Sequence, residues 1–173
     1  MTVIAVKKIG NKFKIAGDSQ ISWGGNKLPM DDKSNDNLKC SGKLFEINHM
    51  TIGCSGSLAH MGLLQWFSKT NMPKSMNRDD VLEWVIGFKN FVTDKTRIEF
   101  NEVNLHGILI KDSKCFVFYD FLDVVEVKNH YAVGSGKYIA LGALESGSSV
   151  EEAVKAAIKY DLYCNGEVTT LEV

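Results

Sequence analysis

Residues 43–67 read KLFEINHMTIGCSGSLAHMGLLQWF, a stretch in which the pattern of apolar residues changes from strand-like to helical. Two short β-prone runs, Leu44–Ile47 and Thr51–Ser55, flank a turn at residues 48–49, which predicts an antiparallel strand pair. From Leu58 onward, apolar residues recur at the three- and four-residue spacing of a helix. A strand pair therefore leads through small residues directly into a helix.

The rest of the sequence predicts further strands and helices on the same criteria. The chain opens with a β-hairpin, Val3–Lys8 and Phe13–Gly17. Two capping signals mark helix starts, because Asn77 precedes acidic residues and Ser149 forms a capping box with Glu152. The other expected elements are a helix through 81–92, strands at 105–110, 116–121, 124–127 and 131–133, a short helix at 138–144, a helix from 150 to about 163, and a closing strand at 167–172.

The order of these elements indicates the architecture. The helices come in pairs between runs of strands, whereas a doubly wound parallel sheet needs strands and helices to alternate. Two stacked antiparallel sheets with a helix pair on each outer face satisfy the order. We therefore expect an α+β fold of the αββα sandwich type, formed by one domain over residues 1–173, with a long polar loop at 22–42.

Net charge, apolar runs and cysteine spacing argue against a nucleic-acid-binding, membrane or secreted protein. The formal net charge of -1 gives no bulk attraction to nucleic acid or to an anionic membrane. No apolar run approaches the ~20 residues of a membrane span, and no secretory signal opens the chain. The four cysteines form no CxxC pair, which favours reduced thiols in an intracellular protein. We expect a cytoplasmic protein that binds neither nucleic acid nor membrane.

Common catalytic and cofactor motifs are missing from the sequence. It contains no HExxH, GxSxG, phosphate-binding or dinucleotide-binding pattern. The histidines do not pair at helical spacing, so no metal site and no cofactor is expected. Gly134-Ser135-Gly136 by itself predicts only a turn.

Thr2 stands out by its position. Removal of Met1, which is usual before a small second residue, would leave a threonine that carries both a hydroxyl and a free α-amine. An α-amine has a pKa of about 7.7–8.0, so part of it is neutral near neutral pH and can accept the hydroxyl proton. The nucleophile would then carry its own general base.

Several other segments accompany Thr2 in a fixed order. Asp18 closes the second strand within AGDSQ, Lys43 opens the third, and GCSGS at 53–57 joins a strand to a helix. The set continues with residues 134–136 and with DLYCNG at 161–166. This ordered set resembles proteasome β subunits and their bacterial relative, the HslV peptidase, over most of the chain.

The resemblance implies the four-layer αββα fold of N-terminal nucleophile hydrolases and a threonine-type peptidase. Thr2 would be the nucleophile, with its own α-amine as the base. Lys43 would lower the pKa of that amine and stabilise developing negative charge, and Asp18 would hold Lys43.

The resemblance also implies roles for residues farther along the chain. The backbone N–H of Gly56 would form the oxyanion hole, and Ser135 and Asp161 would complete the hydrogen bonds around the amine. Cys54 and Ser55 would line the substrate pocket. Cys164 departs from the family pattern, which has a serine there.

Family members cleave unfolded polypeptides inside homo-oligomeric stacked rings, and an ATP-dependent unfoldase usually supplies the substrate. The resemblance therefore implies a peptide or unfolded protein as substrate, a ring assembly and a possible unfoldase partner.

Alternatives remain open at this point. Lys33 or Lys39 could serve in place of Lys43, and a shifted alignment of the hairpin would put Met1 at the nucleophile position. If Met1 is retained, it acylates the amine, and the chain would be a catalytically silent structural or interaction protein. An N-terminal nucleophile amidase that acts on small amides is a further reading.

Overall fold

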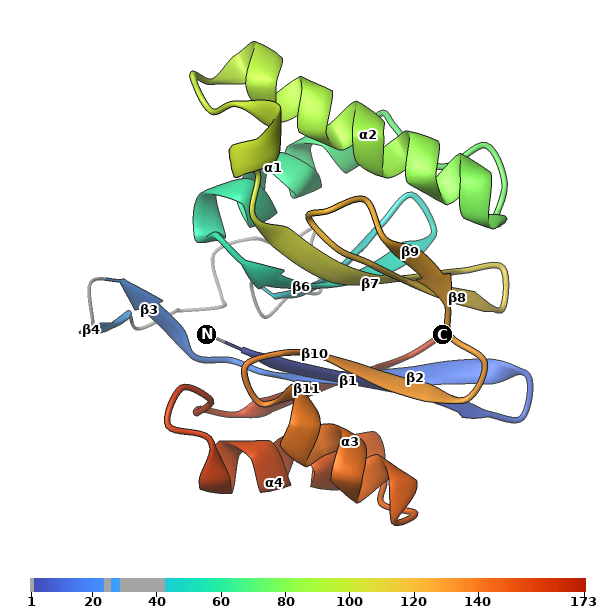
Figure 1. Ribbon diagram of the computed structural model, residues 1–173. Helices are drawn as coiled ribbons and strands as arrows, with labels where there is room; N and C mark the ends of the chain where they lie inside the picture. Colours follow the sequence, from blue (N-terminus) through green and yellow to red (C-terminus); the bar gives the residue numbers. More distant parts are fainter. Residues whose placement is uncertain (1, 24–25, 29–42) are drawn as a thin grey trace.

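The computed structural model describes residues 2–23, 26–28 and 43–173. Figure 1 shows two β-sheets stacked in the middle of the molecule, with one pair of helices against each outer face. This is the αββα sandwich expected from the order of elements, and both sheets are antiparallel.

The first sheet has four strands and carries the start of the described chain. Its strands are, in spatial order, β10 (His130–Gly134), β1 (Val3–Ile9), β2 (Lys12–Asp18) and β11 (Val168–Glu172). The central position of β1 means that Thr2, the residue before it, lies beside the end of β10.

The second sheet has five strands in sequence order. They are β5 (Leu44–Ile47), β6 (Met50–Gly56), β7 (Leu105–Lys111), β8 (Lys114–Phe118) and β9 (Val124–Glu126). A separate short pair, β3 (Ile21–Trp23) and β4 (Asn26–Leu28), follows β2.

The helices cover the sheets in pairs. Above the second sheet lie α1 (Leu58–Ser68) and α2 (Arg78–Lys95), with the short 3-10 helix η2 (Phe100–Glu102) after them, and against the first sheet lie α3 (Lys137–Glu145) and α4 (Val150–Tyr160). The side chain of Asn77 accepts the Asp80 N–H at 2.8 Å, and Ser149 and Glu152 form the complete capping box. Both predicted helix starts are confirmed.

Three apolar layers hold the sandwich together, and strand alternation assigns residues to them. Successive side chains of a strand point to opposite faces, so Val3 and Ala5 of β1 pack against α3 and α4. Ile4 and Val6 of the same strand pack between the two sheets. A third layer, which contains the aromatic residues of α2, lies between α1, α2 and the second sheet.

Some boundaries differ from the sequence-based expectation. The last helix ends at Tyr160 because Asp161 is extended and its carboxylate accepts the Tyr163 N–H at 2.7 Å, a local bond that competes with helix continuation. Strand β8 ends at Phe118 because a turn follows, in which the Tyr119 N–H donates to the carbonyl of Asp123. The predicted loop at 22–42 contains most of β3 and all of β4, and its remainder lies outside the described residues.

Within the described ranges, no helix combines the length and the apolar character that a membrane crossing requires.

The capping box at α4 gives a first testable prediction. Ser149→Ala removes the acceptor of the Glu152 N–H, so the free energy of unfolding should fall by about 1 kcal/mol. Urea unfolding followed by circular dichroism measures the change. Ser148→Ala is the matched control, because no hydrogen bond of that hydroxyl is seen in the described part of the chain. Equal stability of the two variants would contradict the role of the cap.

Candidate active site

Asp18 is the centre of the candidate site. It ends β2 and is fully buried. Its Oδ1 accepts the Val3 N–H at 2.8 Å and the Lys43 ammonium at 2.9 Å, while its Oδ2 accepts the Asn165 N–H at 3.2 Å. One carboxylate therefore joins the first strand, the start of β5 and the segment before β11.

Lys43 forms a buried ion pair with Asp18, with only 3% of its side chain exposed. Loss of hydration lowers the pKa of the Lys43 ammonium from its ordinary value, while the negative charge of Asp18 opposes this shift. The pair brings a cation to the beginning of β1. The alternatives Lys33 and Lys39 lie outside the described residues.

Thr2 lies in this centre and is 1% exposed. Its N–H donates to the Ser135 hydroxyl at 3.3 Å. Its carbonyl accepts from the Ser135 hydroxyl at 3.3 Å and from the Gly136 N–H at 3.4 Å. The turn after β10 thus contacts both polar groups of the Thr2 backbone.

This contact requires a glycine at position 134. Gly134 has a φ of +97°, and a Cβ there would lie 2.0 Å from the Thr2 carbonyl oxygen. Such a distance is far below van der Waals contact, so any side chain would push the turn away from Thr2. From the sequence alone, the Gly-Ser-Gly segment predicts only a turn, and the resemblance adds a role for Ser135.

Residues at the end of β6 form the opposite wall. Gly56 has a φ of +130° and precedes α1 by one residue, Ser57. The Ser55 hydroxyl lies 3.3 Å from the position that a Gly134 Cβ would take, so the two walls approach each other closely. Cys54, which the resemblance placed in a substrate pocket with Ser55, is fully buried and packs in the core below α1 and α2. Strand alternation explains why it faces away from Ser55, since neighbours on β6 face opposite sides. Its role in a pocket stays a prediction.

Asp161 and Cys164 lie behind Ser135. The Cys164 sulfur is 3.7 Å from the Ser135 hydroxyl, and burial raises the pKa of the Cys164 thiol to about 11, with the Asp161 charge contributing. The Asp161 carboxylate accepts the Tyr163 N–H. No hydrogen bond joins that carboxylate to Thr2 or Ser135 among the described residues, so its predicted link to the amine stays a prediction.

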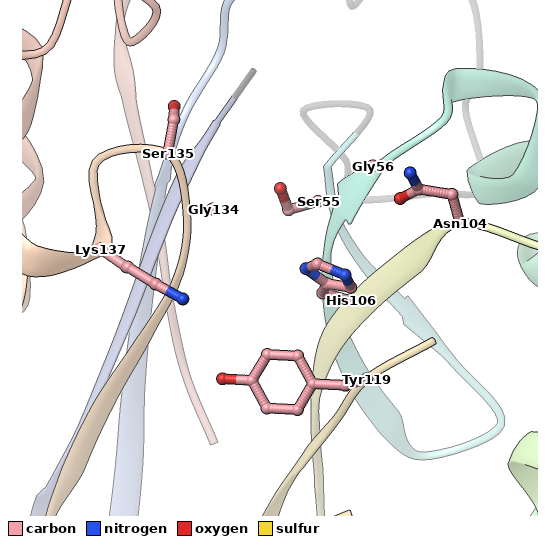
Figure 2. A pocket seen from close by; sticks show the side chains of 8 residues that line it. All are labelled: Ser55, Gly56, Asn104, His106, Tyr119, Gly134, Ser135 and Lys137. Atoms are coloured by element: carbon pink, nitrogen blue, oxygen red, sulfur yellow. The ribbon is translucent and has the colours of Figure 1, made fainter. Parts of the chain in front are cut away.

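A cavity of about 250 Å³ opens beside Ser135 (Figure 2). One wall is the turn between β10 and α3, and the other consists of the ends of β6 and β7 with Tyr119. The lining residues are Ser55, Gly56, Asn104, His106, Tyr119, Gly134, Ser135 and Lys137. The predicted residues Ser55, Gly56 and Ser135 belong to this lining.

Four of the lining residues were not singled out from the sequence: Asn104, His106, Tyr119 and Lys137. His106 Nε2 lies 3.2 Å from an Asp120 carboxylate oxygen, and the Tyr119 and Tyr131 hydroxyls are 3.0 Å apart. Burial and this hydrogen bond raise the pKa of Tyr119. These residues come from separate strands and loops, so no local motif in the sequence identifies them.

The described residues contain no group of three or more His, Cys, Asp or Glu side chains suited to a metal ion. The cysteines at 54, 115 and 164 are free.

Comparison with known proteins identifies the fold. No family model matches the sequence, and no curated protein matches it significantly. Among solved structures, BPH of Thiobacillus denitrificans in complex with epoxomicin has a TM-score of 0.81 at 18% identity, over 99% of this chain and 97% of that one. HslV of Trypanosoma brucei has a TM-score of 0.69 at 16% identity, over 98% of both chains.

A further similar structure is Anbu, an ancestral β-subunit, from Yersinia bercovieri. It has a TM-score of 0.70 at 10% identity and covers 98% of this chain and 80% of that chain. Together these likenesses show that the chain has the proteasome-like fold of the N-terminal nucleophile hydrolases, as the sequence resemblance implied.

The close approach of Gly134 to Thr2 gives a second prediction. Gly134→Ala should lower the free energy of unfolding by about 1–3 kcal/mol or more, because it adds a strained φ and a backbone clash. Gly142→Ala is the matched control in the adjacent helix, where nothing lies within 4 Å of the added Cβ. That variant should gain up to about 1 kcal/mol from helix propensity. Thermal unfolding distinguishes them, and equal stability would exclude the proposed steric constraint.

The buried ion pair gives a third prediction. Lys43→Met leaves the Asp18 carboxylate buried without its cation, which should destabilise the protein by about 3–5 kcal/mol. A double-mutant cycle with Asp18→Asn should show strong coupling, because removing the second charge relieves the first defect. The control is Lys74→Ala, which breaks an exposed ion pair in which Lys74 Nζ lies 3.0 Å from a Glu83 carboxylate oxygen. Its free energy of unfolding should stay close to that of the unaltered protein, because exposed ion pairs contribute little. Additive effects of Lys43→Met and Asp18→Asn would contradict the coupling.

Proposed function

We propose that this protein is a threonine-type endopeptidase that hydrolyses peptide bonds through the Thr2 hydroxyl after Met1 has been removed. The observation that carries the proposal is the convergence of the Thr2 backbone, the Lys43 ammonium and the Asp18 carboxylate in one buried site. Burial of the Lys43–Asp18 pair costs hydration free energy, and groups with a shifted pKa concentrate at functional sites, which supports a functional role for Lys43.

The proposed reaction begins at the Thr2 α-amine. In its neutral form the amine takes the proton of Oγ, which then attacks the carbonyl carbon of the substrate. The Lys43 charge lowers the pKa of the amine, so that more of it is neutral near neutral pH. The Ser135 hydroxyl, 3.3 Å from the Thr2 nitrogen, orients the lone pair of the amine. Asp161 is proposed to complete the hydrogen bonds around the Thr2 amine.

The tetrahedral intermediate needs hydrogen-bond donors for its negative oxygen. The Gly56 N–H is the proposed donor, since Gly56 lines the cavity at the end of β6 just before α1. Collapse of the intermediate forms an ester between the substrate acyl group and Thr2 Oγ and releases an amine. Water then hydrolyses the ester, and the free Thr2 returns.

The chemistry of related folds supports the same assignment. One similar protein, BPH, is known in complex with epoxomicin, and another is HslV. By extension we propose that the chain acts on unfolded polypeptides in the cytoplasm and assembles into stacked homo-oligomeric rings. An ATP-dependent unfoldase is the proposed source of substrate.

A second candidate is a catalytically silent protein that keeps Met1. In this form the Thr2 nitrogen is a backbone amide that donates to Ser135 and cannot act as a base. The two candidates differ in a single chemical feature, a free α-amine on Thr2.

A peptide epoxyketone such as epoxomicin tests this difference. The warhead needs a hydroxyl and a free amine on the same residue, so intact-mass spectrometry should first show the loss of one methionine residue and then one adduct. A full-length mass without an adduct would support the silent protein and reject the peptidase.

Variants of Thr2 provide the controls. Thr2→Ala should abolish both the adduct and peptide hydrolysis while circular dichroism and assembly stay unchanged, because it removes only the hydroxyl and one methyl group. Thr2→Ser keeps a hydroxyl and an amine and should retain adduct formation. Undiminished hydrolysis by Thr2→Ala would rule out the mechanism.

A further inference from the structure

The cavity beside Ser135 contributes Gly56 and Ser135 to the proposed steps, but the rest of its lining has no part in them. Its volume of about 250 Å³ is several times the ~30 Å³ that one water molecule occupies in the liquid, so it can hold one amino-acid side chain with some water. It reaches from the Ser135 turn to Tyr119, past His106 and Asn104 (Figure 2).

The chemistry of the leaving group relates this cavity to one side of the cleaved bond. When the acyl-enzyme forms, a bond between Thr2 Oγ and the carbonyl carbon is made and the bond from that carbon to the leaving nitrogen breaks. The proton that the α-amine took from Oγ passes to the leaving nitrogen. The leaving residue must therefore lie on the side of the amine, which contacts the Ser135 hydroxyl in the cavity wall.

The charge of the residues that line the cavity indicates which kind of substrate side chain it would accept. None of the described lining residues carries a carboxylate, whereas Lys137 contributes an ammonium group whose nitrogen is directed into the open space in Figure 2. Lys137 is the first residue of α3, and the first turn of that helix has no acidic residue that would neutralise it.

The neighbouring groups add donors without cancelling this charge. The Asp120 carboxylate is paired with His106, and the Lys89 ammonium donates to the Asp120 backbone oxygen at 2.5 Å. The Tyr119 hydroxyl and the Asn104 amide complete a polar wall. Among the described residues, an anionic group entering the cavity would therefore meet the Lys137 ammonium, no carboxylate in the lining, and several donors.

We propose that the cavity is the subsite for the residue that follows the cleaved bond, and that it selects an acidic side chain through Lys137. The inference rests on the proposed peptidase function. If a single amino acid leaves, its α-carboxylate carries the same negative charge as an acidic side chain. Amidated peptides, which lack that carboxylate, distinguish the two groups in the experiments below.

Peptide hydrolysis provides the first measurement. Quenched fluorescent peptides with Asp, Ala or Lys after the cleaved bond, each extended and amidated, are compared with the full-length, processed protein. We expect kcat/KM for the Asp peptide to exceed that for the Lys peptide by about fivefold or more, a ratio that corresponds to about 1 kcal/mol. The ratio should fall at high salt, because a partly exposed charge pair is screened.

Variants of Lys137 assign the preference to that residue. Lys137→Met should remove the Asp-over-Lys preference, and Lys137→Glu should invert it. Lys159→Met is the matched control, because Lys159 lies 5.1 Å from the Tyr160 ring much as Lys137 lies 5.0 Å from the Tyr138 ring, but does not line the cavity. No preference in the unaltered protein, or an equal preference in Lys137→Met, would overturn the proposal.

A binding measurement keeps the subsite testable if the protein cleaves no peptide. Amidated peptides that begin with Asp or Ala mimic the leaving product and are titrated calorimetrically into the Thr2→Ala variant with and without Lys137→Met. Tighter binding of the Asp peptide that depends on Lys137 supports the subsite even where hydrolysis fails. Equal binding of both amidated peptides, with tighter binding only of free alanine, would reassign the cavity to a terminal carboxylate.

Discussion

The rest of the site depends on the hydrogen bonds and the ion pair of the Asp18 carboxylate. It is fully buried at the end of β2, and its acceptors are filled by Val3, Lys43 and Asn165, which belong to three separate parts of the chain. An unpaired carboxylate in that place would be strongly unfavourable, so the fold can form only with these partners assembled. The same requirement brings the start of β1 next to a lysine. Folding of the chain therefore also assembles the candidate site.

Around this charge, contacts to the Thr2 backbone determine where Thr2 lies. Its nitrogen and carbonyl are bonded to the turn at 134–136, and Gly134 allows a contact that no other residue would permit. The opposite wall depends on strand alternation, which turns Ser55 toward the cavity and Cys54 toward the core. The cavity consequently opens between two sheets, at a level where each contributes one wall.

The sequence predicted the fold well because its signals are local. Caps at Asn77 and Ser149, paired helices and β-prone runs are each encoded within a few residues. It located Asp18, Lys43 and Ser135 through a resemblance, and their proximity in space agrees with that reading, while their catalytic roles remain proposals. His106 and Lys137 could not be predicted, since their proximity arises from the stacking of two sheets. Cys54 is fully buried in the core, and its predicted place in a substrate pocket stays a prediction.

The bonds of Asp18 also affect how the molecule fluctuates. The ends of strands and the segments beside them normally open most readily and exchange their amide hydrogens with solvent deuterium first. Here the amides of Val3 and Asn165 donate to a carboxylate in the interior, so neither segment can detach without exposing a buried ion pair. We expect these two amides to exchange as slowly as the core, although Val3 is only the first residue of β1 and Asn165 lies in no strand. Any opening that admits a substrate would then occur in the elements around the candidate site.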